Sequence, residues 1–179
     1  TIELHYSAAA TPALMGVLPY PDCDAAAQPL AELSASARRL DYPAMLIHAA
    51  VHRAKHQVTP FKAGDKVYHD GDRLIWIYDF SLLARAMTPP QWERFATDAQ
   101  RYGVAAICAD ALETAQRLFI TPVPAEVLAT LNQIEAKTPE TEYLKEQQLG
   151  RAWRNFRALE GADSKVTFLR TKLLPSAKF

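Results

Sequence analysis

The stretch from Leu40 to Met87 constrains the fold most, because it places ionisable side chains inside helices that are otherwise apolar. In its first half, Asp41 can cap a helix, and Pro43 fits the first turn, where no amide donor is needed. The apolar face of this helix is formed by four residues at helical spacing, Ile47, Val51, Ala54 and Val58. We therefore predict an amphipathic helix that begins near Asp41.

A polar stripe runs beside that apolar face. It consists of three histidines spaced four residues apart and one lysine: His48, His52, Lys55 and His56. Two imidazoles at this spacing can share a zinc ion, but the stripe turns by about 80° from first to last and no cysteine joins it. We predict that the histidines bind no transition metal and form a hydrogen-bonded polar seam between helices.

The second half of the stretch, residues 74–86, is apolar on nearly every side, and a helix of that kind is expected to be buried. Asp79 lies in its middle, and a buried carboxylate needs a partner. The chemically suited partners are in the preceding helix. We predict that Asp79 is buried and hydrogen-bonded to His52, His56 or Lys55.

Periodicity and helix-ending residues indicate a mainly helical chain. The further helices are expected at residues 88–103, 104–119, 121–136, 138–159 and 164–174. An Asp70–Gly71 dipeptide between apolar pairs indicates a small hairpin. Trp76, Trp92 and Trp153 each lie on an apolar helical face and are predicted to be core residues. The fold expected is a bundle of about six or seven helices.

Before this bundle, residues 1–7 alternate between apolar and polar side chains, which is typical of a strand. Such a strand needs a sheet to satisfy its backbone, so an exposed one could pair with another molecule. Residues 8–39 are rich in alanine and proline and resemble a connector. We divide the chain into residues 1–39, with the strand and connector, and residues 40–179, the helical domain.

Charge and cysteine content exclude several classes of protein. The 20 basic and 20 acidic residues cancel, so no large positive field is present to gather nucleic acid or a membrane surface. No apolar run reaches the length of a membrane span. Cys23 and Cys108 lack a CxxC spacing, which indicates neither a disulfide framework nor a thiolate metal site. A reducing, cytoplasmic location is expected.

Five segments in order resemble the uncharacterised nucleotidyltransferase family of the polymerase-β-like superfamily. They are Ile2–Tyr6, Leu46–His56, Arg73–Phe80, Pro122–Leu128 and Leu173–Ser176. The resemblance implies an α/β nucleotidyltransferase domain whose last strand bears a third metal-binding carboxylate, followed by an all-helical domain. Glu3 matches that carboxylate, which makes it the candidate catalytic and metal-binding residue. Without the resemblance, Glu3 is simply a polar residue on the solvent face of an edge strand.

The same resemblance implies a reaction. The parent protein is expected to transfer a nucleoside monophosphate from an NTP to an unidentified acceptor hydroxyl or amine with Mg²⁺, and the family's paired Asp-x-Asp would precede Thr1. We therefore expect a piece trimmed at both ends, inactive and without a cofactor by itself. His5 and the histidine seam are candidates for contact with substrate. A different hypothesis is a helical binding module without chemistry, which a start codon just before Thr1 would favour.

Overall fold

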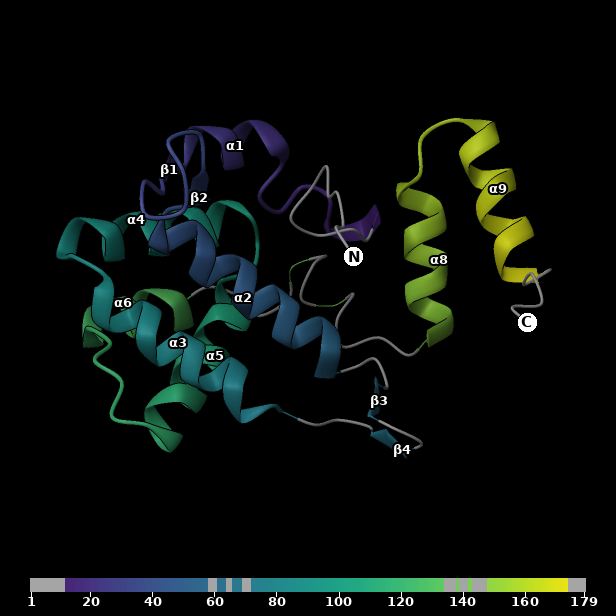
Figure 1. The fold of residues 1–179 in the computed structure, drawn as a ribbon. Helices are drawn as coiled ribbons and strands as arrows, with labels where there is room; N and C mark the ends of the chain where they lie inside the picture. The colour runs from purple at the N-terminus through teal and green to yellow at the C-terminus, as the bar shows by residue number, and fades with distance from the viewer. Residues whose placement is uncertain are drawn as a thin grey trace.

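The computed structural model describes residues 12–57, 61–63, 66–68, 72–133, 138, 142 and 148–173. Its α-helices are α1 (Tyr20–Ala25), α2 (Tyr42–Gln57), α3 (Leu74–Ala86), α4 (Pro89–Arg101), α5 (Ala105–Leu118), α6 (Ala125–Asn132), α8 (Gln148–Ala158) and α9 (Ala162–Leu173). A 3₁₀ turn, η1 (Pro12–Leu14), precedes them. The prediction of a mainly helical bundle is confirmed, and α1 is an additional helix inside the proposed connector (Figure 1). The predicted strand at residues 1–7, with Glu3 and His5, lies outside the described residues.

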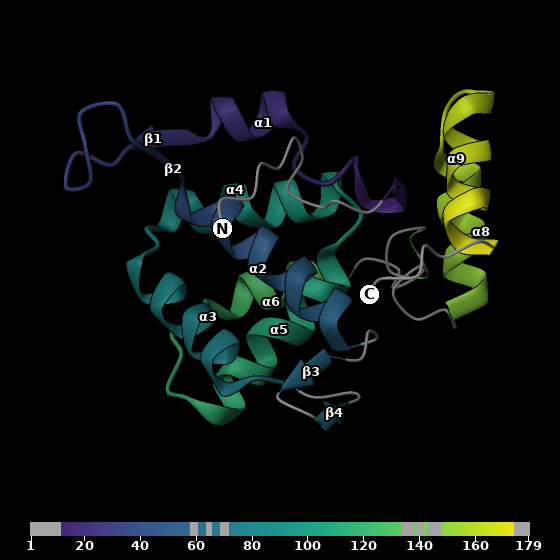
Figure 2. The same cartoon turned by 45° about the vertical axis from the view of Figure 1, so that its right-hand side comes forward.

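The core of the bundle is organised around α5. This helix contacts α2, α3, α4 and α6. Small side chains let these neighbours approach closely, since Ala109, Ala111 and Ala115 are buried together with Cys108 and Leu112. The two largest fully buried side chains, Phe80 of α3 and Phe95 of α4, complete this core. In Figure 2, α2, α3 and α5 lie side by side, while α8 and α9 stand apart as a helical pair.

Several helix boundaries follow directly from local sequence. Thr88 starts α4, where its backbone N–H donates to Oε1 of Gln91 at 2.9 Å. Gly103 ends the same helix with φ of 68°, a conformation that glycine adopts without steric cost. The helix predicted at 121–136 corresponds to α6, which runs from Ala125 to Asn132. Residues 134–137 lie outside the described part.

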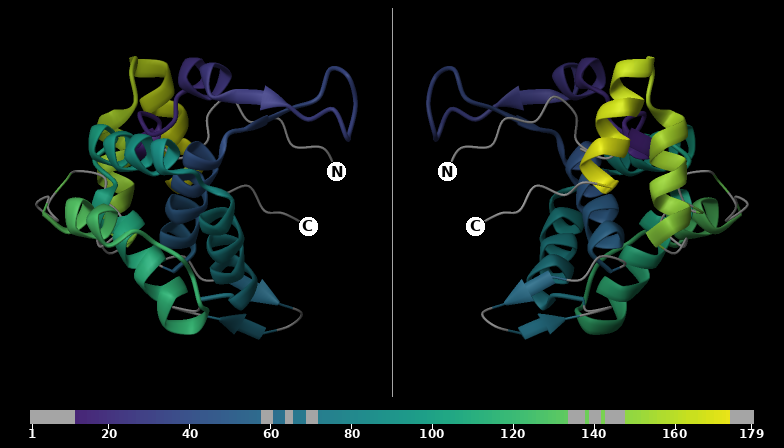
Figure 3. Two further views of the ribbon diagram at one scale, coloured as in Figure 1. Left: turned by 90° about the vertical axis from the view of Figure 1, so that its left-hand side faces the viewer. Right: turned by 90° about the vertical axis from the view of Figure 1, so that its right-hand side faces the viewer.

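The structure has two short antiparallel hairpins. One pairs β1 (Ala27–Pro29) with β2 (Arg38–Leu40). The other pairs β3 (Phe61–Ala63) with β4 (Lys66–Tyr68). A small hairpin was expected near Asp70–Gly71; the structure has one nearby, but its strands flank residues 64 and 65. Leu74 and Ile75 begin α3, in agreement with the helix predicted at residues 74–86. Figure 3 shows both hairpins projecting from the helical body.

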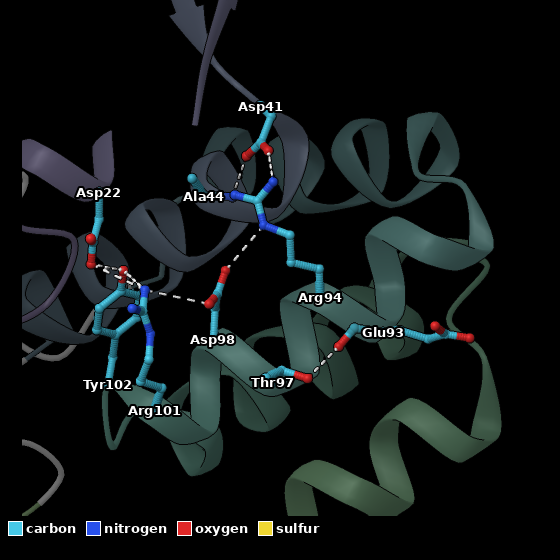
Figure 4. A network of polar contacts seen from close by, with 9 residues as sticks. All are labelled: Asp22, Asp41, Ala44, Glu93, Arg94, Thr97, Asp98, Arg101 and Tyr102. Carbon is cyan, nitrogen blue, oxygen red and sulfur yellow. Dashed lines mark hydrogen bonds and ion pairs between the residues drawn. The ribbon is translucent and has the colours of Figure 1, made fainter. Parts of the chain in front are cut away.

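A network of charged side chains fixes the start of α2 (Figure 4). Asp41 caps the helix as predicted, accepting a bond from the backbone N–H of Ala44 at 3.1 Å. Its second oxygen accepts from Arg94 of α4, whose guanidinium also donates to Asp98 at 3.3 Å. The Asp41 side chain is only 3% exposed. The cap therefore also ties α2 to α4.

The same face of α4 is tied to α1. The Tyr102 hydroxyl donates to Asp22 at 2.6 Å, and Arg101 reaches the same carboxylate at 3.1 Å. Burial raises the pKa of Tyr102, and its hydrogen bond to Asp22 adds to the effect. The short α1 is thereby held against the bundle (Figure 4).

Two burial predictions were wrong. Helix α3 is buried on one face only, through Ile77, Phe80, Ser81 and Ala84. Its other face, including Asp79, is exposed because the helix packs against α2 and α5 on one side. Trp153 is 61% exposed, since α8 packs against η1 and α9 and not within the main bundle.

Candidate functional site

The predicted histidine stripe forms a cluster with the start of α3. The His52 and His56 ring centroids lie 4.4 Å apart, and His48 is 6.2 Å from His52. Trp76 completes the cluster: its ring is 5.4 Å from His52, edge to face, and 5.2 Å from His56. The guanidinium of Arg73 lies over the Trp76 ring at 5.0 Å. Helices α2 and α3 thus place four aromatic rings and a cation at one surface.

Packing and positive charge keep these imidazoles neutral. The pKa of His52 is lowered to about 4, first by partial burial and then by His56, His48, Lys55 and Arg73. The pKa of His56 is lowered as well, by burial and by the charges of Lys55 and Arg73. His52 keeps contact with solvent, but the neighbouring rings remove part of its hydration. At neutral pH each of these two rings therefore offers one hydrogen-bond donor and one acceptor, without charge.

Beneath the cluster lies a buried arginine that sequence analysis missed. Arg53 is 2% exposed, and its Nε and Nη2 each donate to Asp72 at 2.7 Å. Its Nη1 donates to Asp110 of α5 at 2.5 Å, and Thr114 lies 3.4 Å from Nη2. Burial alone would lower the pKa of Arg53, but the bonds to both carboxylates outweigh it and the pKa is raised. A paired guanidinium is one of the few charges that a helical core accepts.

The ion pair between Arg53 and Asp72 holds the chain segment that carries Arg73 of the cluster. Asp72 adjoins Arg73 in sequence, so a bidentate bond from α2 to Asp72 fixes the chain where Arg73 reaches Trp76. Gln57 adds a further bond to Asp72 at 3.2 Å. The sequence carried a signal for the burial of Arg53 but none for its partners. Arg53 lies at the i+3 and i+7 positions from the buried Ala50 and Leu46, where an arginine must have a partner.

Of the remaining predicted site residues, Lys55 acts on the cluster and Asp79 lies outside it. Lys55 is half-buried in α2 and influences both imidazoles electrostatically. Asp79 does not belong to the cluster. It is exposed on the outer face of α3, so the predicted bond to the histidine helix was wrong. A carboxylate on that face stays hydrated and needs no buried partner.

The kinds of side chain that lie together determine which metal ions the cluster could bind. Within the ranges that the structure describes, no three His, Cys, Asp or Glu side chains are grouped to hold a metal ion. The prediction that the histidines bind no transition metal remains to be tested by elemental analysis. Mg²⁺ prefers oxygen ligands, and the exposed cluster offers imidazole nitrogens. The described residues therefore do not fit a magnesium site.

Comparison with known proteins places the cluster within a recognised family. The model of the family described as uncharacterised nucleotidyltransferase matches residues 1–120, which contain α1 to α5 and every residue of the cluster and its ion pair. No curated protein and no solved structure matches the chain. No helix in the described ranges has the length and apolar character required to cross a membrane. Because the match covers more than half of its length, the chain belongs to the uncharacterised nucleotidyltransferase family.

Proposed function

We propose that this chain is the mainly helical part of a metal-dependent nucleotidyltransferase, which moves a nucleoside monophosphate from an NTP to an acceptor hydroxyl or amine. Family membership supports the nucleotide substrate. The observation that carries the proposal is the exposed cluster of His52, His56, Trp76 and Arg73, which lies wholly within the matched residues. Residues 1–39 would end the catalytic domain, and residues 40–179 would form the helical domain.

The cluster suits contact with a nucleotide or acceptor more than proton abstraction. A pKa of about 4 makes His52 a weak base at neutral pH. Its uncharged ring, with that of His56, can instead exchange hydrogen bonds with phosphate or sugar oxygens. The positive charges of Arg73 and Lys55 favour an anionic ligand nearby. We assign these side chains the role of binding and orienting substrate.

Glu3 is proposed as the third metal-binding carboxylate, on the resemblance alone. Nucleotidyl transfer uses Mg²⁺ to neutralise the triphosphate and activate the acceptor oxygen. One carboxylate cannot hold this octahedral ion by itself, and the described residues supply no suitable set. We therefore expect no turnover by residues 1–179 alone.

The test is a transfer assay with Mg²⁺ and each labelled NTP. This chain is compared with the full product of its gene, with and without Glu3→Gln. Turnover by the longer protein that is abolished by Glu3→Gln supports the proposal, and turnover by residues 1–179 alone contradicts the account of the metal site. Folded Arg73→Ala and His56→Ala variants of the longer protein should raise KM for the nucleotide or acceptor. Unchanged kinetics would remove the cluster from the substrate site.

A helical binding module without chemistry is the second candidate. The observation that favours it is an exposed apolar stripe on the outer face of α3. Its members are Leu74, Ile75, Tyr78 and Leu82, with exposures from 46% to 67%. Stripes of this kind often mark protein contacts. Inactivity of the full gene product with every NTP, together with a partner bound through this stripe, would favour the second candidate.

A further inference from the structure

A cavity lies at the end of α3 opposite to the histidine cluster. It has a volume of about 570 Å³, opens to solvent, and is lined by the end of α3, the starts of α4 and α6, and the segment before α6. Met87, Trp92 and Val127 form apolar walls, and Trp92 and Val127 are each only 5% exposed. The volume is large enough for a small organic molecule.

The walls are held in place before any ligand binds. Pro89, Pro122 and Pro124 line the cavity, and each has a backbone φ fixed by its ring. Directly before Pro122, Thr121 is buried and its hydroxyl donates to the backbone oxygen of Ala115 in α5 at 3.0 Å. A rigid wall costs little conformational entropy on binding, which favours affinity for a small ligand.

The charged residues of the cavity define the ligand that it fits. Arg85 keeps its positive charge, and its guanidinium is directed at the backbone oxygen of Ile120, to which it donates. Glu93 and Glu126 also line the cavity, and within the described part of the chain the structure gives their carboxylates no hydrogen bond or ion pair. Figure 4 shows the Glu93 side chain pointing away from the network of Asp41, Arg94 and Asp98. Two exposed carboxylates therefore lie at the cavity and can attract a cation.

We propose that this cavity binds a small organic monocation, an apolar body that carries one primary ammonium group. The body lies against Trp92, Met87 and Val127, and the ammonium group lies at the rim between Glu93 and Glu126. The two carboxylates repel an anionic ligand of the same shape. The cavity is separate from the histidine cluster, since Trp76 and Arg85 are about 14 Å apart along α3 at 1.5 Å per residue. The proposal is therefore independent of nucleotide transfer.

The experiment uses the three tryptophans of the chain as reporters. The protein is labelled with 5-fluorotryptophan, and the ¹⁹F resonance of Trp92 is assigned with Trp92→Phe. Hexylammonium is the probe, and hexanol and hexanoate are the matched neutral and anionic ligands. Hexylammonium should shift the Trp92 resonance saturably and leave those of Trp76 and Trp153 in place. Hexanol should bind about fivefold more weakly, as the loss of one partly exposed ion pair predicts.

Variants then test the role of the carboxylates. Glu93→Gln combined with Glu126→Gln should abolish the preference for hexylammonium over hexanol, while Asp79→Asn, an exposed carboxylate outside the cavity, should retain it. Retention of the preference in the double variant would overturn the proposal. An unshifted Trp92 resonance, or equal affinity for the ammonium ligand and the alcohol in the unaltered protein, would also overturn it, and neither result depends on the glutamate variants folding.

Discussion

Removal of the carboxylate of Asp72 should destabilise the protein strongly, because it removes two of the three hydrogen bonds that the buried Arg53 donates to carboxylates. The Arg53 side chain is 3% exposed, and two of its nitrogens donate to Asp72 at 2.7 Å. Breaking a fully buried ion pair costs about 3–5 kcal/mol. Asp72 is 30% exposed and Asp110 remains as a partner, so we expect Asp72→Ala to cost about 2–3 kcal/mol.

The reverse change should be milder. In Arg53→Met the apolar stem still fills its space, and the carboxylates left behind, on Asp72 and Asp110, are 30% and 64% exposed and can be hydrated. We expect a loss of about 1 kcal/mol, since no charge is then left buried and both carboxylates keep access to water. A larger loss of stability in Asp72→Ala than in Arg53→Met would therefore show that the unpaired buried cation causes the loss.

Urea unfolding followed by far-UV circular dichroism measures both changes. Asp24→Ala is the matched control, because Asp24 pairs with Arg38 at the surface, with side chains 55% and 51% exposed. That variant should lose less than about 1 kcal/mol. An Asp72→Ala midpoint equal to that of the control, or a larger loss for Arg53→Met, would refute the reasoning.

Three further outcomes are expected. Asp41→Ala should lower the free energy of unfolding by about 2 kcal/mol. Asp41→Asn should lower it less, because asparagine keeps the cap to Ala44 and loses only the charge that faces Arg94. Equal urea midpoints for the two variants would contradict this. The contribution of His52 to the free energy of unfolding should be fully present above pH 6.5 and should fall toward pH 4, because the unfolded chain binds more protons than the folded one in that window. After discounting for solvent screening, the loss is about 1 kcal/mol. His52→Gln should flatten this pH profile. Asp79→Ala should change stability by less than about 0.5 kcal/mol, as for an exposed residue, and a loss near 3 kcal/mol would restore the predicted buried bond.

The starts and ends of several helices could be predicted from the sequence by itself, because their signals are local. Asp41 caps α2 through a bond to the third residue after it, and Thr88 starts α4 through Gln91. Gly103 ends α4 because the backbone there has a positive φ. The histidines also had to share a side of α2, since a spacing of four residues brings side chains close on a helix. Each of these predictions depends on residues within one or two turns.

Only the tertiary structure decided which charges are buried and which face of each helix is covered. Asp79 lies within an apolar sequence and is exposed, whereas Arg53, one position from His52, is buried against Asp72 and Asp110. Those partners are 19 and 57 residues away, so no local pattern names them. Helix α3 likewise carries more apolar side chains than its one packed face can bury. Burial depends on where α2 and α5 come to lie, which is a property of the whole packed bundle.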